Sequence, residues 1–133
     1  MTDSAKIIIR SVLAEDKNLI MATWLKGNYY GNPYFWNVPQ DIYFKEYAKI
    51  ITAILFTPGV EALIACDESN PSFVLGFSVF KDDAIHWVYV KRDYRMAGIA
   101  KMLLGHREFK TIKSITRQGR FLAEKHGLVF NPF

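Results

Sequence analysis

Apolar residues recur along this chain with two periods, and these periods predict where its helices and strands lie. In residues 14–26 and 41–56 an apolar side chain returns every three or four positions, which is typical of a helix with one buried face. The predicted inner faces are Leu19, Ile20, Thr23 and Trp24 in the first helix and Ile42, Tyr43, Tyr47, Ile50, Ile51 and Ile54 in the second. Residues 28–39 contain Gly, Pro and Asn at short intervals and are predicted to form a loop.

Short apolar runs between turn residues predict the strands. The runs cover residues 6–10, 60–66, 73–80, 84–90, 112–115 and 128–130. Two more helices are predicted, from Gly98 to about Phe109 and from Arg117 to His126, with Gly127 as the C-cap of the second. The order of elements, β-α-α-β-β-β-α-β-α-β, predicts one α/β domain that spans residues 1–133 around a mixed sheet.

Composition narrows the class of protein. Of the 133 residues 50% are hydrophobic and 15% are aromatic, which is enough for a substantial core. No apolar run approaches the roughly 18 to 20 residues of a membrane span, and the first residues lack the pattern of a secretory signal. The single cysteine, Cys66, excludes an internal disulfide, and no Cys/His spacing typical of a metal site occurs. We expect a cytoplasmic protein without membrane contact or bound metal.

Charge is distributed unevenly along the chain. Residues 1–90 carry 7 Lys and Arg against 10 Asp and Glu, whereas residues 91–133 carry 10 against 3. The formal net charges of the two parts are therefore −3 and +7, within a total of +4. Clustered positive charge attracts phosphate groups, whether of a nucleic acid or of a phosphorylated small molecule. A solvated basic surface without a specific ligand is the alternative interpretation.

The segment VYVKRDYRMAGIAKMLL, residues 88–104, links a predicted strand to a predicted helix through small residues. The first N–H groups of a helix have no partner within it, and the positive end of the helix dipole lies behind them. Small side chains at Ala97, Gly98 and Ala100 would let a phosphate reach these groups, and Arg92 and Arg95 would add positive charge. A plain strand-to-helix turn, with glycine for close packing, is the alternative.

The same segment resembles a known family. Arg95-x-x-Gly98-x-Ala100 is similar to the Arg/Gln-x-x-Gly-x-Gly/Ala signature of the GCN5-related N-acetyltransferases (GNAT). The preceding VYVKRDYR is similar to the family's V-x-P-x-Y-R, with Arg92 at the proline, and residues 116–130, TRQGRFLAEKHGLVF, resemble its last helix and strand. The order of elements also matches. The chain further resembles the compact acetyltransferase-like proteins of bacteriophages, whose location would be the host cytoplasm.

The resemblance implies a cofactor and its binding residues. Acetyl-coenzyme A would lie in a splay between the strand of residues 84–90 and a neighbouring parallel strand. Backbone groups of residues 88–90 would hold its acetyl carbonyl and pantetheine arm, and the N–H groups of residues 96–100 would hold its pyrophosphate. The implied cofactor-binding residues are Val88, Tyr89, Val90, Arg95, Met96, Ala97, Gly98, Ile99, Ala100, Lys101 and Thr116.

Three features depart from the family pattern. Thr116 stands where the last helix often opens with asparagine, and because threonine is a good N-cap this position also has a purely structural interpretation. Ala123 stands where many members carry a general-acid tyrosine, so this residue cannot protonate the leaving thiolate. The usual closing strand is not expected, which leaves a sheet edge that is short or is completed by a second chain, as in a homodimer.

His86 is the candidate general base. Some members of the family carry a catalytic histidine at this position, and in a regular strand His86, Val88 and Val90 share one face. An imidazole that titrates near neutral pH can take the proton that an amine loses during acyl transfer. The alternative is a histidine packed and hydrogen-bonded within the sheet. Glu61 and Asp83 are fallback bases, although each also fits a simple surface charge.

An aromatic segment between the two early helices is the candidate acceptor site. Its residues are Tyr29, Tyr30, Tyr34, Phe35 and Trp36. In the family this region commonly walls the acceptor site, and aromatic rings can stack on a planar substrate or a base. Packing over the core, or against a second copy, is the alternative. Cys66 is expected to be buried in a strand, and His106 and His126 are expected to face solvent.

These residues and motifs support two functions from different classes. The first is an acetyl-coenzyme A-dependent N-acetyltransferase that transfers the acetyl group directly to the amine of a small-molecule or macromolecular acceptor. The second is a non-catalytic binding protein on the same fold, virion- or nucleic-acid-associated through basic residues 91–133. A variant of the first, a GNAT-like enzyme that modifies DNA bases, would fit both the basic surface and the aromatic segment.

Overall fold

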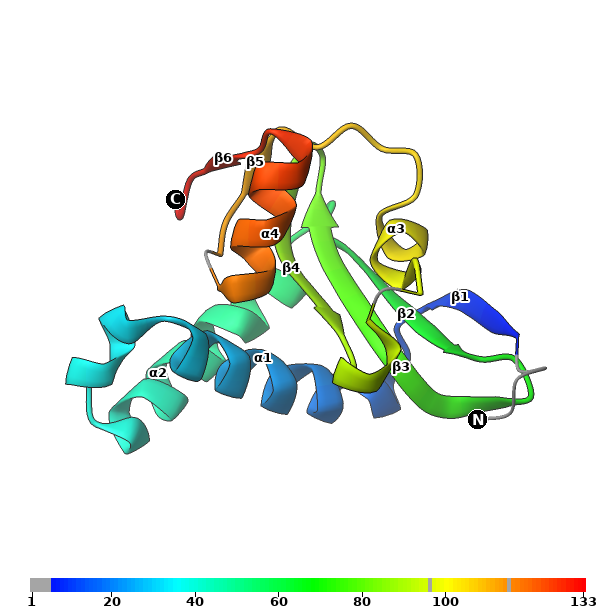
Figure 1. The fold of residues 1–133 in the computed structure, drawn as a ribbon. Coiled ribbons are helices and arrows are strands. Elements are labelled where there is room, and N and C mark those ends of the chain that lie inside the picture. The colour runs from blue at the N-terminus through cyan, green and yellow to red at the C-terminus, as the bar shows by residue number, and fades with distance from the viewer. Residues whose placement is uncertain (1–5, 96, 115) are drawn as a thin grey trace.

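A computed structural model describes residues 6–95, 97–114 and 116–133, and Figure 1 shows its fold. The strands are β1 (Ile7–Ser11), β2 (Glu61–Asp67), β3 (Asn70–Lys81), β4 (Ala84–Val90), β5 (Thr111–Ile112) and β6 (Val129–Phe130). The α-helices are α1 (Lys17–Gly31), α2 (Gln40–Leu55), α3 (Ile99–Leu104) and α4 (Arg117–His126). Short 3-10 helices are η1 (Ala14–Asp16), η2 (Pro33–Asn37) and η3 (Arg92–Tyr94).

All six of these strands belong to one sheet, in the order β1-β2-β3-β4-β5-β6. The first four are antiparallel neighbours, whereas β5 is parallel to β4 and β6 is parallel to β5. A parallel neighbour needs a crossover connection, and the segments that contain α3 and α4 provide the two crossovers. The expected α/β fold around a mixed sheet is therefore confirmed, with the two-residue strand β6 at one edge.

Helices cover both faces of the sheet, as Figure 1 shows. Under α1 and α2, the core cluster includes Ile20, Trp24, Ile51, Phe77 and Trp87. On the opposite face, Leu103 of α3 and Leu122 of α4 are buried in two further clusters. The sheet is therefore a central layer whose β4 strand contacts helices on both sides.

The first helix is longer than predicted. It continues to Gly31, so the prediction of a loop from residue 28 is wrong for its first four residues. Asn28 and Tyr29 are buried on the inner face, and Asn32 Nδ2 donates to the Asn28 carbonyl at 2.9 Å. This bond satisfies an acceptor in the last turn, where helical partners are missing. The rest of the predicted loop is largely η2.

The third helix and the fifth strand are shorter than predicted. The helix expected to reach Phe109 stops at Leu104, because Gly105 adopts a positive φ of 65° that breaks the helical path. The strand expected over residues 112–115 is limited to Thr111–Ile112, and Ile115 lies outside the described residues. A short β5 means that β4 loses its parallel neighbour early.

Parts of the predicted inner faces are exposed. Leu19 of α1 and Ile42 and Ile50 of α2 have exposed fractions of 42%, 51% and 47%. Apolar spacing selects a helical stripe, but the angle at which the helix meets the sheet decides which side of that stripe is covered. On α1 the buried side is shifted toward Leu25, which the pattern did not include.

Candidate active site

β4 and β5 separate soon after they meet. They pair over two positions, the last of which joins Ile85 to Ile112. β4 nevertheless continues along β3 as far as Val90. Among the described strands, β4 from His86 onward therefore has a neighbour on its β3 side alone, and its other edge is open. The expected splay between the strand of residues 84–90 and a parallel neighbour is present.

His86 lies in a β-bulge at the start of this splay. Opposite Val79 of β3 stands Trp87, and opposite Phe80 stands Ile85. His86 is thus the additional residue of β4, without a direct partner on β3. A bulge of this kind redirects a side chain, which is why bulges are frequent beside functional sites.

The bulge changes the face on which His86 lies. Val88 is buried with residues of α3 and α4, and Val90 is buried beside α3. His86 instead lines pockets together with Ile54 of α2, on the opposite face of the sheet. The expectation that His86, Val88 and Val90 share one face is therefore wrong, because simple alternation of side chains does not survive an inserted residue.

Two pockets meet at His86, and Lys113 and Ile54 also line both of them. The first, which we call the turn pocket, has a volume of about 340 Å³ and lies beside residues 81–84 of the β3–β4 turn. The second, which we call the aromatic pocket, has a volume of about 180 Å³. Its other walls include Trp24, Tyr47, Ile50 and residues 132–133.

The surroundings of His86 favour a neutral imidazole. Its pKa is lowered from the usual 6.5, first by burial and then by the positive charges of Lys113 and Lys81. A histidine whose pKa is lowered is largely deprotonated at neutral pH, so a ring nitrogen has a free lone pair. His86 therefore has the protonation state that a general base needs, in a place that a small molecule can reach.

The segment between β4 and α3 is not a direct turn. It contains η3, and Gly98 then adopts a left-handed φ of 79° immediately before α3. Apart from Gly98 itself and its two neighbours in the chain, no described atom lies within 4 Å of the position that a Cβ at Gly98 would occupy. The first hydrogen bond of the helix runs from the Met102 N–H to the Gly98 carbonyl at 3.1 Å. The N–H groups of residues 99–101 come before this bond, where a helix offers its N–H groups no carbonyl partner.

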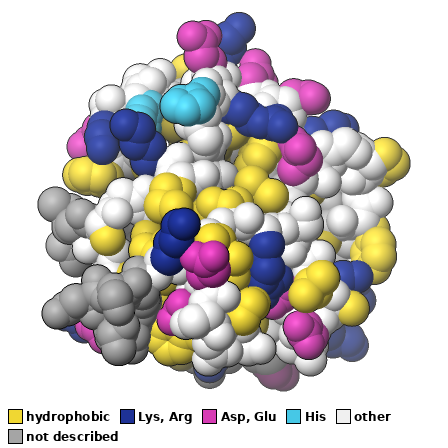
Figure 2. All heavy atoms as spheres, turned by 90° about the vertical axis from the view of Figure 1, so that its right-hand side faces the viewer, with side chains coloured by type: hydrophobic (Ala, Val, Ile, Leu, Met, Phe, Trp, Pro, Cys, Tyr) yellow, Lys and Arg dark blue, Asp and Glu magenta, His cyan; other side chains and the backbone are white. Residues whose placement is uncertain are grey.

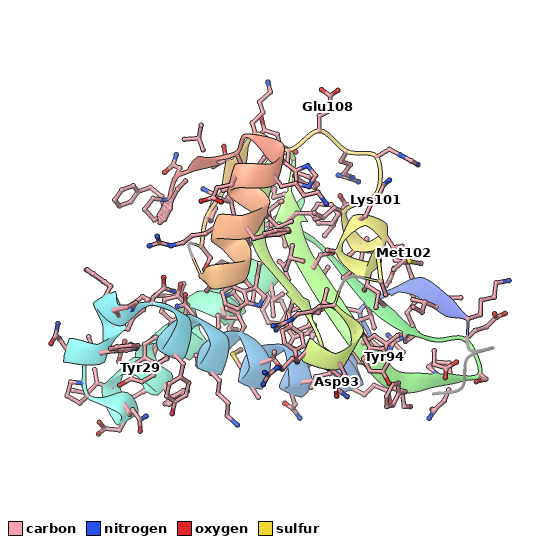
Figure 3. All side chains as sticks on the ribbon, viewed as in Figure 1. Tyr29, Asp93, Tyr94, Lys101, Met102 and Glu108 are labelled. Atoms are coloured by element: carbon pink, nitrogen blue, oxygen red, sulfur yellow. The ribbon has the colours of Figure 1, made fainter. Side chains whose placement is uncertain are left out.

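The charged residues of this segment have different surroundings. Arg95 Nε donates to the Val90 carbonyl at 3.0 Å, which ties the segment to the end of β4. Lys101 is exposed, and Figure 3 shows it on α3 near Met102. Ala97 is exposed as well, whereas Met96 lies outside the described residues. Of the predicted phosphate-binding residues, Arg95 thus lies at the end of β4, and Gly98 and Lys101 lie in the first turn of α3.

The three predicted pantetheine-binding residues follow the bulge along β4. Val88 and Val90 are buried, and Tyr89 is half-buried with its ring 5.6 Å from that of Phe77. Their side chains pack against other residues of the protein, so any contact with a cofactor would come from the backbone. Ile99 and Ala100 of α3 behave in the same way, since both belong to the adjoining cores.

Thr116 has a structural role in this fold. Its Oγ1 accepts a hydrogen bond from the Gly119 N–H at 3.2 Å, which caps the N-terminus of α4. Ala123, in the middle of the same helix, is half-buried against the core. Its methyl side chain has no proton to donate to a leaving thiolate.

The aromatic segment does not line either pocket. Phe35 packs on Tyr43 and Tyr47, and Tyr29 is buried beside the first of these rings. The remaining members, Tyr30, Tyr34 and Trp36, have exposed fractions of 60%, 81% and 57%. Figure 3 places Tyr29 at the α1–α2 end of the molecule, far from the labelled residues of α3. The segment's inner rings belong to the core, and its outer rings are available on the surface.

The fallback bases differ in their surroundings. Glu61 forms an ion pair with Arg107, with an Oε2–Nη2 distance of 2.7 Å. Asp83 is exposed and lines the turn pocket, so it remains near His86. Cys66 is fully buried in β2, and His106 and His126 are exposed, as predicted.

Sequence reasoning missed most residues of the two pockets, four of which surround His86 with apolar surface, a hydroxyl and positive charge. These four are Tyr47 and Ile54 of α2, which were assigned to the core alone, and Lys81 and Lys113. The two lysines flank β4 in space, but in the sequence each belongs to a separate charged stretch. A signal that could have found Lys113 is its place directly after the parallel neighbour of β4.

The surface does not carry one continuous basic patch on the face of Figure 2. Lys and Arg side chains there are interspersed with Asp and Glu around a hydrophobic centre. Within residues 6–95, 97–114 and 116–133, no group of three His, Cys, Asp or Glu side chains is arranged to hold a metal ion. In the same part of the chain, every helix is too short or too polar to cross a membrane.

Comparisons with known proteins agree with this architecture. No protein-family model and no curated protein matches the chain. A candidate acetyltransferase from Pyrococcus furiosus has a TM-score of 0.64 at 16% identity, over 95% of this chain and 82% of that one. An aminoglycoside N-acetyltransferase in complex with CoA has a TM-score of 0.52 at 17% identity, over 98% and 91%.

A candidate GNAT-family acetyltransferase from Staphylococcus aureus has a TM-score of 0.54 at 17% identity, over 71% of this chain and 82% of that one. These similarities extend over most of the chain. The resemblance seen in residues 88–104 and 116–130 thus agrees with the three-dimensional arrangement. The chain has the fold of the GCN5-related N-acetyltransferases.

Proposed function

We propose that this chain is an acetyl-coenzyme A-dependent N-acetyltransferase that transfers the acetyl group directly to an amine. The observation that carries the proposal is the position of His86, a neutral imidazole in a bulge at the start of the splay and in the wall of two pockets. A base at this position would act on an acceptor that binds on the α1–α2 side of the sheet, while the cofactor would lie along the edge of β4 that β5 leaves open.

The residues along the splay fit acetyl-coenzyme A. Among the described strands, β4 beyond His86 has no partner on the side of β5. Apart from the Val90 carbonyl, which accepts from Arg95 Nε, its backbone groups on that side can hydrogen-bond an extended pantetheine arm. The open space at Gly98 admits a pyrophosphate, which the N–H groups of residues 99–101 and the exposed Lys101 would bind. When bound, acetyl-coenzyme A supplies the acetyl group as a thioester.

His86 would act on the amine. As the C–N bond forms and the C–S bond breaks, the amine nitrogen loses a proton, and His86 takes it directly or through one water. Ala123 cannot return a proton to the sulfur, so the sulfur leaves as a thiolate and takes any proton from water. The sulfur leaves readily as a thiolate because a thiol has a pKa of about 8.5.

Binding of coenzyme A to a glycine variant of α3 tests the proposal. Gly98→Glu places bulk and negative charge in the proposed pyrophosphate site. Gly105→Glu is the control, because Gly105 lies at the other end of α3, also has a positive φ and also has open space around the position of a Cβ. Calorimetry is expected to show a loss of affinity of at least about tenfold for Gly98→Glu.

The control is expected to bind coenzyme A as the parent protein does. Equal affinities of the parent and both variants would contradict the assignment of the phosphate site. No binding of coenzyme A by the parent protein, together with a salt-sensitive shift of DNA in electrophoresis, would instead favour the nucleic-acid-binding alternative.

A further inference from the structure

We infer that the acceptor is an amine that also carries an acidic group, and that Lys113 binds this acidic group in the aromatic pocket beside His86. The inference rests on the proposed function, since it concerns the substrate of the same site. It names a chemical class, an apolar or aromatic amine with a carboxylate or phosphate, which the fold alone does not indicate.

The first support is the charge of the aromatic pocket. Among the described side chains that line it, Lys113 is the one that is charged at neutral pH, since the imidazole of His86 is neutral. Lys113 is half-buried, and among the described residues it forms no ion pair with a carboxylate. An ammonium without a carboxylate partner can pair with an anionic ligand, and a charge-assisted hydrogen bond of this kind is stronger than one between neutral groups.

The aspartates nearby do not fill this role. Asp82 and Asp83 line the turn pocket, where Lys81 is also present, and both aspartates are exposed. Neither lines the aromatic pocket. The turn pocket thus contains side chains of both signs of charge, whereas the charged side chain of the aromatic pocket is a cation. An acidic group is therefore better accommodated in the aromatic pocket than in the turn pocket.

The second support is the position of both lysines relative to His86. The charges of Lys113 and Lys81 reach the imidazole and oppose its protonation. An acceptor amine beside His86 would feel the same field, which favours the neutral, nucleophilic amine over the ammonium. The same field repels an acceptor that carries several positive charges. An acidic group on the acceptor removes this repulsion by pairing with Lys113.

The third support is the apolar wall of the aromatic pocket. Trp24, Ile50 and Ile54 provide apolar surface, and the pKa of the Tyr47 hydroxyl is raised by burial, so this hydroxyl stays neutral. A pocket with one cation and apolar walls selects a ligand with one anionic end and an apolar body. Free amino acids with apolar side chains and apolar amines with a phosphate group both meet this description.

Proton NMR of the imidazole C–H signals tests the inference without requiring catalysis. The probes are 3-phenylpropionate, phenylethylphosphonate and the neutral isostere 3-phenylpropanamide. We expect saturable shifts of the His86 signals with one of the acids and at least about tenfold weaker binding of the amide. The acid that binds more tightly identifies carboxylate or phosphate as the preferred group. The exposed His106 and His126 serve as internal references.

Two lysine variants complete the design. Lys113→Gln is expected to abolish the preference for the acid, while Lys110→Gln, an exposed lysine on the same segment that lines neither pocket, is expected to keep it. Equal binding of acid and amide, or an unchanged preference in Lys113→Gln, would overturn the inference while coenzyme A binding still supports the proposed function. Recognition of the acid without any binding of coenzyme A would overturn the proposed function, and with it the pocket's role as an acceptor site.

Discussion

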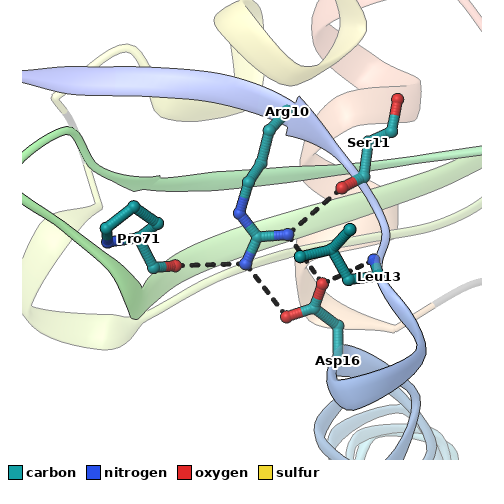
Figure 4. A network of polar contacts seen from close by, with 5 residues as sticks. All are labelled: Arg10, Ser11, Leu13, Asp16 and Pro71. Atoms are coloured by element: carbon teal, nitrogen blue, oxygen red, sulfur yellow. Dashed lines mark hydrogen bonds and ion pairs between the residues drawn. The ribbon is translucent and has the colours of Figure 1, made fainter.

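Arg10 and Asp16 form a two-point ion pair that joins β1 to the start of α1 (Figure 4). Nη1 of Arg10 lies 2.7 Å from Oδ2 of Asp16, and Nη2 lies 3.0 Å from Oδ1. The same guanidinium donates to the Pro71 carbonyl, and Oδ2 accepts the Leu13 N–H at 2.7 Å. One nearly buried pair thus fixes the β2–β3 end of the sheet relative to α1.

Removal of this pair is expected to destabilise the fold. Asp16→Asn leaves the Arg10 guanidinium, with a side-chain exposure of 16%, without its anion. Breaking a buried ion pair on one side costs about 3 kcal/mol. Glu15→Gln, on the neighbouring exposed residue, is the control and is expected to change stability by less than about 0.5 kcal/mol. Urea unfolding followed by circular dichroism measures both, and equal midpoints for the two variants would contradict the prediction.

The same pair predicts a dependence of stability on pH. The pKa of Asp16 is lowered from its usual 3.8, first by its hydrogen bonds to Arg10. The contribution of this carboxylate to the free energy of unfolding is therefore fully present above pH 3.8. It is lost as the pH falls through the lower pKa that Asp16 has in the folded state. Urea midpoints between pH 2 and pH 6 are expected to fall more steeply in the parent protein than in Asp16→Asn. Parallel curves would show that Asp16 has no linkage to folding.

Gly76 is expected to be required where β3 passes β4. A Cβ at this position would collide with the Tyr89 carbonyl and lie 3.2 Å from the Val90 Cα, so Gly76→Ala must push β4 away from β3. We expect a loss of about 2 kcal/mol from this overpacking. Gly127→Ala is the comparison, because Gly127 has a φ of 65° but open space, and strain alone costs about 1 kcal/mol. A greater loss for Gly127→Ala in thermal unfolding would argue against the steric account.

His86 is expected to determine how the acetylation rate depends on pH. The base acts in its deprotonated form, so the rate rises with pH through the pKa of His86, and that pKa lies below the usual 6.5 because of burial and of Lys113. His86→Ala is expected to lower kcat by roughly 100-fold or more, the usual scale for a general base. Coenzyme A affinity, measured by calorimetry, is expected to stay the same.

His86→Gln separates chemistry from packing in the same experiment. Glutamine keeps part of the side-chain volume and a hydrogen-bonding group, but it cannot take a proton at neutral pH. A fully active Gln variant with an unchanged pH profile would identify His86 as a packing residue. Asp83, which lines the turn pocket, would then be the base to examine, because Glu61 is held by Arg107.

The sequence by itself determined the order of elements and the place of the α3 segment. Both depend on local rules: apolar periodicity selects helix or strand, and Gly98 permits the left-handed conformation that precedes α3. The role of Thr116 as an N-cap could also be predicted from the sequence, because capping involves residues three positions apart. The absence of a proton donor at Ala123 required no structure at all.

Only the tertiary structure decided which residues surround His86. The bulge is a property of the pairing between β3 and β4, since an inserted residue has no signature in the alternation of one strand alone. It moved His86 to the face of Ile54 and away from Val88. The two pockets join Lys113 to residues of α2 that lie about half the chain away, and such neighbours are set by how helices pack on the sheet, which no short-range pattern encodes.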